Sequence, residues 1–147
     1  MKKKTISILT LIIILLVCII IYFRPLSLSS LVTEDSLINM ISSEYVLKNG
    51  EPDIDTVEYK DITAEQKNVL LPILEKYAYR RTFGTLFSNG SMSGTGNKTL
   101  SIYVFDDNSD SIFVTALDKI AVNNKNYHME NSEQFMEQII EIMAQEK

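Results

Sequence analysis

Hydrophobic and polar positions divide the chain into an apolar N-terminal run and a longer region of mixed character. The run extends from Thr5 to Phe23, contains no charged residue, and follows three lysines at positions 2–4. A helix over these positions spans roughly 28 Å at about 1.5 Å per residue, close to the thickness of the hydrocarbon layer of a bilayer. The pattern therefore predicts a transmembrane helix over residues 5–23, with the lipid bilayer as a partner of the chain.

The charges that flank this run predict its orientation. Three lysines precede it and the single Arg24 follows it, so the positive-inside rule places the N-terminus in the cytoplasm and the C-terminal part outside. Residues 1–24 are thus predicted to form a cytoplasmic basic start and a single-pass anchor in the cell membrane. Secretory signal peptides usually have a shorter apolar stretch of about 7–15 residues, which favours an uncleaved signal anchor.

Two alternatives to the uncleaved anchor stay open. Ser27 and Ser29 are small residues at the spacing that a signal peptidase reads, and cleavage there would release a secreted protein. Acylation of Cys18 after cleavage would make a lipoprotein. Because Val17 stands where a small residue is expected before an acylated cysteine, we interpret Cys18 as one more apolar side chain in lipid.

The pattern after the anchor begins with a stalk and a β-hairpin. Residues 25–35 are rich in serine and lack periodicity, which predicts a stalk. Residues 37–47 alternate as a strand does, although their apolar positions also fit one face of a helix, and we favour the strand. The turn signal Asn49-Gly50 and the β-rich segment 56–62 then predict a hairpin with a longer loop.

The middle of the domain is predicted to contain a helix and a loop. Thr63 and Gln66 have the spacing of a capping box, in which each side chain bonds the other residue's backbone N–H at the start of a helix. Apolar residues then recur at the spacing of one buried helix face up to Tyr77, and Pro72 within this pattern is expected to kink or divide the helix. Glycine and serine punctuate residues 88–98, which predicts the longest loop.

The C-terminal part is predicted to contain a β-meander and a last helix. The strands are expected at residues 99–105, 111–117, 120–123 and 126–129. Asn131 or Ser132 caps the helix, and its apolar stripe is formed by Phe135, Ile139 and Met143. The sequence thus predicts an α+β fold: an N-terminal transmembrane helix is followed by a small domain over residues 36–147, in which two main helices pack on one face of an antiparallel β-sheet.

Charge and cysteine content narrow the partners and the compartment. Four of the 14 basic residues lie within residues 1–24, which leaves 10 against 19 acidic residues in the rest of the chain. This negative balance argues against binding of nucleic acid. The one cysteine lies inside the apolar run, so the outer domain has no disulfide. That suits the envelope of a bacterial cell better than the small disulfide-rich secreted proteins.

Two groups of residues share part of a known binding motif. Asn97 precedes Lys98 after a glycine-rich stretch, but a phosphate-binding loop requires glycine at that position. Asp106, Asn108 and Asp110 have the first spacing of a calcium loop, but the glycine that should follow is absent. We therefore interpret both segments as solvated turns.

Histidine chemistry is equally sparse. His128 is the single histidine and has no cysteine partner outside the apolar run, so the chain lacks the ligands of a zinc site and the pair of a cysteine nucleophile. The sequence predicts no catalytic residue, no cofactor and no metal site. It predicts a protein that is not an enzyme.

One basic and aromatic cluster stands out in the acidic domain, and it is the predicted interaction surface: Lys76, Tyr77, Tyr79, Arg80 and Arg81. In an extended segment the two arginines point to opposite faces, so we expect one to pair with the domain's own carboxylates and the other to meet a partner. The predicted function is that of a membrane-anchored, non-enzymatic domain that contacts an unidentified envelope protein. The alternative is a domain that senses or carries a small ligand.

Three segments, ITAEQKNVLLPILEKYAYRRTF, TLSIYVF and NNKNYHM, together resemble a group of small envelope proteins of Firmicutes. Those proteins combine an N-terminal signal or anchor with a compact domain that contains a helix, a Tyr-x-Tyr segment followed by basic residues, and a terminal β-meander. The resemblance covers about residues 36–145. It implies an envelope location and this fold, and it implies no catalytic residue because the function of the group is uncharacterised.

Overall fold

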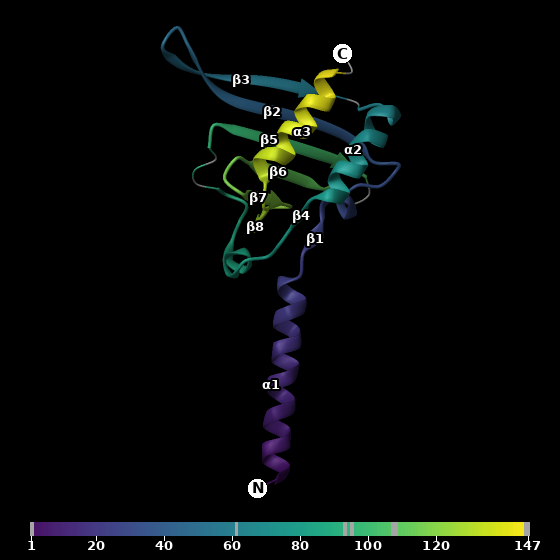
Figure 1. The fold of residues 1–147 in the computed structure, drawn as a ribbon, viewed down its shortest axis with the longest axis vertical. Coiled ribbons are helices and arrows are strands. Elements are labelled where there is room, and N and C mark those ends of the chain that lie inside the picture. The colour runs from purple at the N-terminus through teal and green to yellow at the C-terminus, as the bar shows by residue number, and fades with distance from the viewer. Residues whose placement is uncertain (1, 61, 93, 95, 107–108, 146–147) are drawn as a thin grey trace.

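A computed structural model of the chain describes all residues except 1, 61, 93, 95, 107–108 and 146–147. The side chains of residues 2–6 and 145 also lie outside this description. The elements follow one another along the chain (Figure 1) as α1 (Lys2–Phe23), β1 (Leu26–Ser27), the 3-10 helix η1 (Leu28–Leu31), β2 (Leu37–Lys48), β3 (Glu51–Tyr59), α2 (Ala64–Lys76), β4 (Ala78–Tyr79), the 3-10 helix η2 (Phe83–Phe87), β5 (Lys98–Phe105), β6 (Ser111–Thr115), β7 (Lys119–Val122), β8 (Lys125–His128) and α3 (Ser132–Gln145).

The fold is α+β, as predicted, with an antiparallel sheet and three α-helices. Six strands form the main sheet in the order β3-β2-β5-β6-β7-β8, and β1 pairs with β4 in a small second sheet. In Figure 1 the six strands lie one above another, with β8 nearest to α1 and β3 farthest from it. Within the described part of the chain, no helix is both long and apolar enough to cross a membrane.

The β2–β3 hairpin confirms the strand predicted for residues 37–47. Its turn is tighter than predicted, because Asn49 and Gly50 have positive φ angles of 55° and 84° and the flanking Lys48 and Glu51 are already paired. Two successive residues with positive φ make the turn that fits the twist of a hairpin. The predicted longer loop is wrong because β3 begins at Glu51 and includes Pro52, which an edge strand tolerates.

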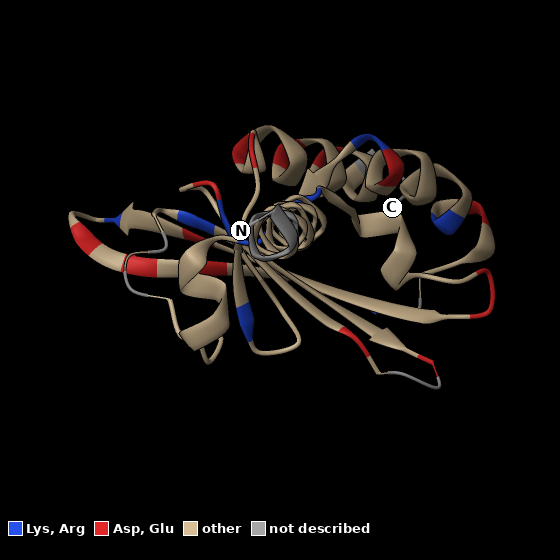
Figure 2. Cartoon of the chain, turned by 90° about the horizontal axis from the view of Figure 1, so that it is seen from below, with Lys and Arg blue, Asp and Glu red and all other residues tan. Residues whose placement is uncertain are grey.

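Helices α2 and α3 lie on the same side of the main sheet, which is clearest in the view along α1 (Figure 2). The capping box predicted at Thr63 is present: its hydroxyl accepts from the Gln66 N–H at 3.3 Å, and the Gln66 side chain accepts from the Thr63 N–H at 3.0 Å. Pro72 lies within one continuous helix, so the expected division is wrong. Pro72 is exposed and has no N–H to donate to the carbonyl one turn earlier, so water can bond that carbonyl instead.

The core fills the space between these helices and the sheet. Alternate residues of β2, β5 and β6 point into it, and their partners on the helices are as deeply buried. Side chains with no more than 1% exposure include Ile38, Met40, Leu100, Ile102, Ile112 and Val114 from the sheet and Leu70, Leu74, Phe135, Met136, Ile139 and Met143 from the helices. The helix stripe predicted for residues 135–143 is therefore the buried face of α3.

The stalk predicted for residues 25–35 is wrong, and the domain begins before residue 36. Leu26 pairs with Tyr79 in the small sheet, and the Leu28 N–H donates to the Tyr77 carbonyl at 3.5 Å. Leu28 is fully buried and Val32 is 7% exposed, so both belong to the core. Only two residues separate α1 from β1. The helix therefore enters the domain directly, with no free spacer.

Candidate functional site where the helix meets the domain

The predicted interaction surface divides between core and surface. Tyr77 is 6% exposed, its ring lies 5.1 Å from that of Phe135, and its hydroxyl donates to the Gln138 Oε1 at 3.2 Å. Tyr79 is 5% exposed and packs edge-on against Tyr127 at 4.9 Å. Burial raises the pKa of both Tyr77 and Tyr79, that of Tyr79 to about 12. The two tyrosines therefore hold β4 against the domain and do not form a contact surface.

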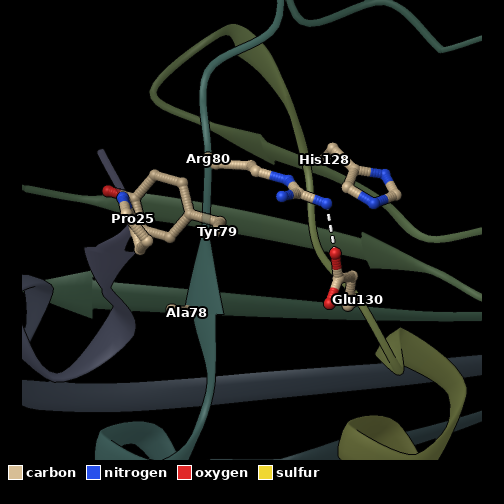
Figure 3. A pocket seen from close by; sticks show the side chains of 6 residues that line it. All are labelled: Pro25, Ala78, Tyr79, Arg80, His128 and Glu130. Atoms are coloured by element: carbon tan, nitrogen blue, oxygen red, sulfur yellow. Dashed lines mark hydrogen bonds and ion pairs between the residues drawn. The ribbon is translucent and has the colours of Figure 1, made fainter. Parts of the chain in front are cut away.

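The basic side chains of the predicted surface have different neighbours. Lys76 is exposed, and its Nζ lies 5.7 Å from the centre of the Tyr77 ring. Arg80 forms an ion pair with Glu130 (Figure 3). The backbones of Arg80 and His128 exchange hydrogen bonds of 2.9 Å and 3.0 Å, which join β4 to the edge of the main sheet. Arg80 is thus the arginine that pairs with a carboxylate of its own domain.

Arg81 reaches the end of α1 and contacts its own chain there, and the expectation that the second arginine also meets a partner stays a prediction. Its Nη1 donates to the Tyr22 carbonyl at 3.3 Å, and its guanidinium lies 5.3 Å from the centre of the Tyr22 ring. The neighbouring Phe83 packs against Phe23, with ring centres 4.9 Å apart. These contacts fasten the segment after β4 to the last turn of α1. We call these four residues the junction cluster.

A second surface was not foreseen, and it is the uncovered face of the main sheet. The register brings Leu37 opposite Phe105, Asn39 opposite Tyr103, and Tyr45 opposite Ile54 on the side away from the helices. Leu37 is 63% exposed, Phe105 is 50% exposed and Tyr103 is 40% exposed. The period-2 pattern of strands 37–47 and 99–105 carries this signal, because apolar residues occupy both sides of each strand.

The hollows near the arginines are small or open. The one that Figure 3 shows has a volume of about 110 Å³ and lies beside Tyr79, Arg80, His128 and Glu130. His128 also borders a second hollow of about 350 Å³, whose lining includes Lys119 and Asn126. Drug-sized ligands occupy sites of roughly 300–1,000 Å³, so of these two hollows beside His128 the second has room for such a molecule.

The solvated turn predicted around Asp106 and Asp110 behaves as a turn in its described residues, whereas Lys98 of the glycine-rich segment lies in β5 and pairs with Glu44. Asp106 accepts from the Ser36 hydroxyl at 3.0 Å and from the Ser109 N–H at 3.1 Å, and Asp110 accepts from the Asn123 side chain. Asn108 lies outside the described residues. Among the described side chains, no group of three or more His, Cys, Asp or Glu could hold a metal ion.

Comparison with known proteins adds no further constraint, since no protein-family model, curated protein or solved structure matches this chain. Its function therefore has to be inferred from the geometry of the junction cluster, the uncovered sheet face and α1.

Proposed function

We propose that the chain is a membrane-anchored domain on the outer side of a bacterial cell membrane, where it binds an envelope protein and catalyses no reaction. The observation that carries this proposal is the uncovered sheet face, which joins exposed aromatic and aliphatic side chains to serine, threonine and asparagine. Interfaces are enriched in aromatic residues and depleted of charge, and this face has that composition in an otherwise acidic domain.

The exposure of α1 supports the anchor. The large apolar side chains between Ile8 and Ile21 are 43% to 70% exposed, and they surround the whole helix. Figure 1 shows α1 projecting away from the domain, which leaves these side chains without a protein core to cover them. A helix that is apolar on all sides requires an apolar surrounding. A bilayer supplies one, and the run from Thr5, which includes residues whose side chains are not described, matches its thickness.

The arrangement of the exposed apolar pairs along the sheet supports a role in binding a protein. The exposed apolar pairs of the uncovered face extend from Leu37 and Phe105 to Tyr45 and Ile54, so they follow the length of β2. A surface of this shape suits a flat protein partner better than a small molecule, which prefers a concave site.

Small-ligand binding is the second candidate function, and the hollow of about 350 Å³ beside His128 favours it. The buried Asn126 Oδ1 has no hydrogen-bond partner among the described residues, and its residue lines this hollow. An unpaired buried acceptor is costly unless a donor occupies the space beside it. Water satisfies this need as well as a ligand, which leaves protein binding as the better supported function.

Crosslinking in intact cells tests the protein-binding surface. A photoreactive residue placed at Leu37 should form an adduct with one protein, and Tyr103→Lys should abolish this adduct because a charge in an apolar interface loses its hydration. Tyr103 is 40% exposed, so the melting temperature should not change.

Glu137, an exposed residue of α3, provides the matched control. Glu137→Lys places the same lysine side chain on the helix side of the domain, with a charge change of two units instead of one, and should leave the adduct intact. Equal adduct yields with Tyr103→Lys and with Glu137→Lys would show that the uncovered face is not the binding surface.

A further inference from the structure

The 3-10 helix η2 exposes a cluster of large apolar side chains. Phe83 is 78% exposed, Leu86 is 58% exposed and Phe87 is 89% exposed. These are the residues that a soluble surface normally hides, and here they are three of the five residues of one short helix. We call them the apolar tip.

The apolar tip is held outward by a rigid base. Thr85, the buried residue of η2, donates its hydroxyl to the Asn126 carbonyl at 2.6 Å. The Thr82 N–H donates to the Thr85 hydroxyl oxygen at 2.9 Å, and the Ser88 hydroxyl donates to the Thr85 carbonyl at 2.9 Å. Both ends of η2 are therefore fixed to the domain through Thr85. The exposure of the phenylalanines is a property of the fold and not of a loose loop.

The apolar tip lies at the level where α1 ends. The contact of 4.9 Å between the rings of Phe83 and Phe23 joins it to the last residue of that helix. In Figure 1 the corresponding teal coil forms the lower margin of the domain, beside the upper end of α1. Tyr22 and Phe23 are residues of the kind that occupies the boundary between lipid and water. The apolar tip therefore lies at the same height along the α1 axis as these boundary residues.

Charge around the apolar tip fits a lipid surface. No acidic residue occurs between Glu75 and Asp106, although the whole chain contains 19. Arg24 and Arg81 line a hollow of about 480 Å³ together with the apolar Ile21 and Cys18 of α1. Cationic groups above an apolar wall match a phospholipid, whose phosphate lies above its acyl chain. The Tyr22 hydroxyl beside them is buried and has no hydrogen-bond partner among the described residues.

We propose that the domain rests on the bilayer that holds α1, with the apolar tip inserted at the base of the headgroup layer and with Arg24 and Arg81 at the lipid phosphates. This inference rests on the proposed anchoring of α1. Lipid is the occupant because the apolar tip continues the lipid-facing surface of α1 without a break, through Phe23. An insertion of this kind is typical of interfacial membrane contacts, which combine buried apolar side chains with basic residues.

Tryptophan fluorescence tests the insertion in the full-length chain, which contains no tryptophan of its own. Phe87→Trp adds a single reporter at a side chain so exposed that the fold need not adjust. The variant is reconstituted into vesicles of phosphatidylcholine and phosphatidylglycerol, with or without bromine on the acyl chains. We expect a blue-shifted emission in both vesicles and a large loss of intensity with the brominated lipid.

Leu47→Trp is the matched control. Leu47 is 73% exposed at the far end of the β2–β3 hairpin, and its reporter should emit as it does in water and lose no intensity to bromine. Flotation of the vesicles tests the anchoring of α1 separately from the insertion of the apolar tip. Chain that floats with the vesicles while Phe87→Trp matches Leu47→Trp would overturn the insertion and leave the anchor in place. Chain that fails to float would overturn the anchor and the insertion together.

A protein occupant of the apolar tip gives a different result. In that case Phe87→Trp would shift its emission only in native membranes and would behave as Leu47→Trp does in pure lipid vesicles. That outcome would overturn the lipid proposal.

Discussion

Burial of Tyr79 links the stability of the domain to alkaline pH. Burial raises the pKa of Tyr79 from 10.0 to about 12. The unfolded chain loses this proton at a lower pH than the folded chain does, so the stabilising contribution is complete below pH 10 and is lost as pH rises from about 10 to about 12. We expect Tyr79→Phe to reduce the fall of the melting temperature over this window.

The matched control for Tyr79→Phe is Tyr103→Phe, which removes a hydroxyl from a side chain that is 40% exposed. This variant should keep the wild-type dependence on pH. A curve for Tyr79→Phe that coincides with the wild type from pH 9 to pH 12 would contradict the assignment.

The two arginines are expected to differ in their effect on stability. The side chains of Arg80 and Glu130 are 51% and 64% exposed, and exposed ion pairs contribute little, so Arg80→Ala should cost less than about 0.5 kcal/mol. Arg81 is half-buried and contacts both the ring and the carbonyl of Tyr22, so Arg81→Ala should cost on the order of 1 kcal/mol. Urea unfolding of the full-length chain in detergent micelles measures both values. A larger cost for Arg80→Ala would refute this division of roles.

At the scale of elements, the loop before β5 docks on the turn between β7 and β8. A Cβ added at Gly90 would lie 2.7 Å from the Asn124 Cα, whereas one added at Gly94 would meet nothing within 4 Å. Both glycines have positive φ angles, 81° and 68°, so alanine is strained at each.

Comparing Gly90→Ala with Gly94→Ala isolates the contact with Asn124. Gly94→Ala should cost about 1 kcal/mol from backbone strain alone, and Gly90→Ala should cost roughly 1–3 kcal/mol more because the turn must move. Thermal unfolding of both variants is the measurement. Equal melting temperatures would show that the loop does not rest on the turn.

Elements with a local signal could be predicted from the sequence. The capping box at Thr63, the turn at Asn49-Gly50 and the apolar stripe of α3 depend on residues a few positions apart, and all three are present. The turn between β7 and β8 was predicted one residue late. Asn123 and Asn124 form this turn with positive φ angles, but the polar residues that follow them also favour turns, so the sequence does not mark which pair forms it.

Elements fixed by distant partners could not be predicted. Leu28 is buried because β1 pairs with β4, about fifty positions later, and nothing within residues 25–35 signals that pairing. The same holds for the junction cluster: the basic and aromatic composition near Arg81 was visible, but its contact with Tyr22 depends on how α1 enters the domain. Strand alternation separated the two arginines correctly. It did not identify their neighbours.

At the scale of the whole molecule, the proposed topology is testable in cells. Protease added outside protoplasts should digest the domain, because the lysines before the apolar run are expected to stay in the cytoplasm. Without protease, the full-length chain should sediment with membranes, because the apolar run is expected to stay in the bilayer. Immunoblots of the membrane and soluble fractions give the measurement.

A chain recovered only in the culture medium, with a new N-terminus near Ser30, would show a cleaved signal instead. Full protection of the domain from external protease would contradict the proposed orientation.

The direct entry of α1 into the domain couples the orientation of the domain to the rotation of the helix about its own axis. Two residues separate α1 from β1, and Arg81 and Phe83 contact the last turn of α1, so rotation of the uncovered sheet face about the helix is restricted. One residue inserted into α1 turns the helix that precedes it by about 100° relative to the domain, whereas seven residues return it to within about 20°. The helical phase of the anchor would thus set the direction in which the domain faces along the membrane plane.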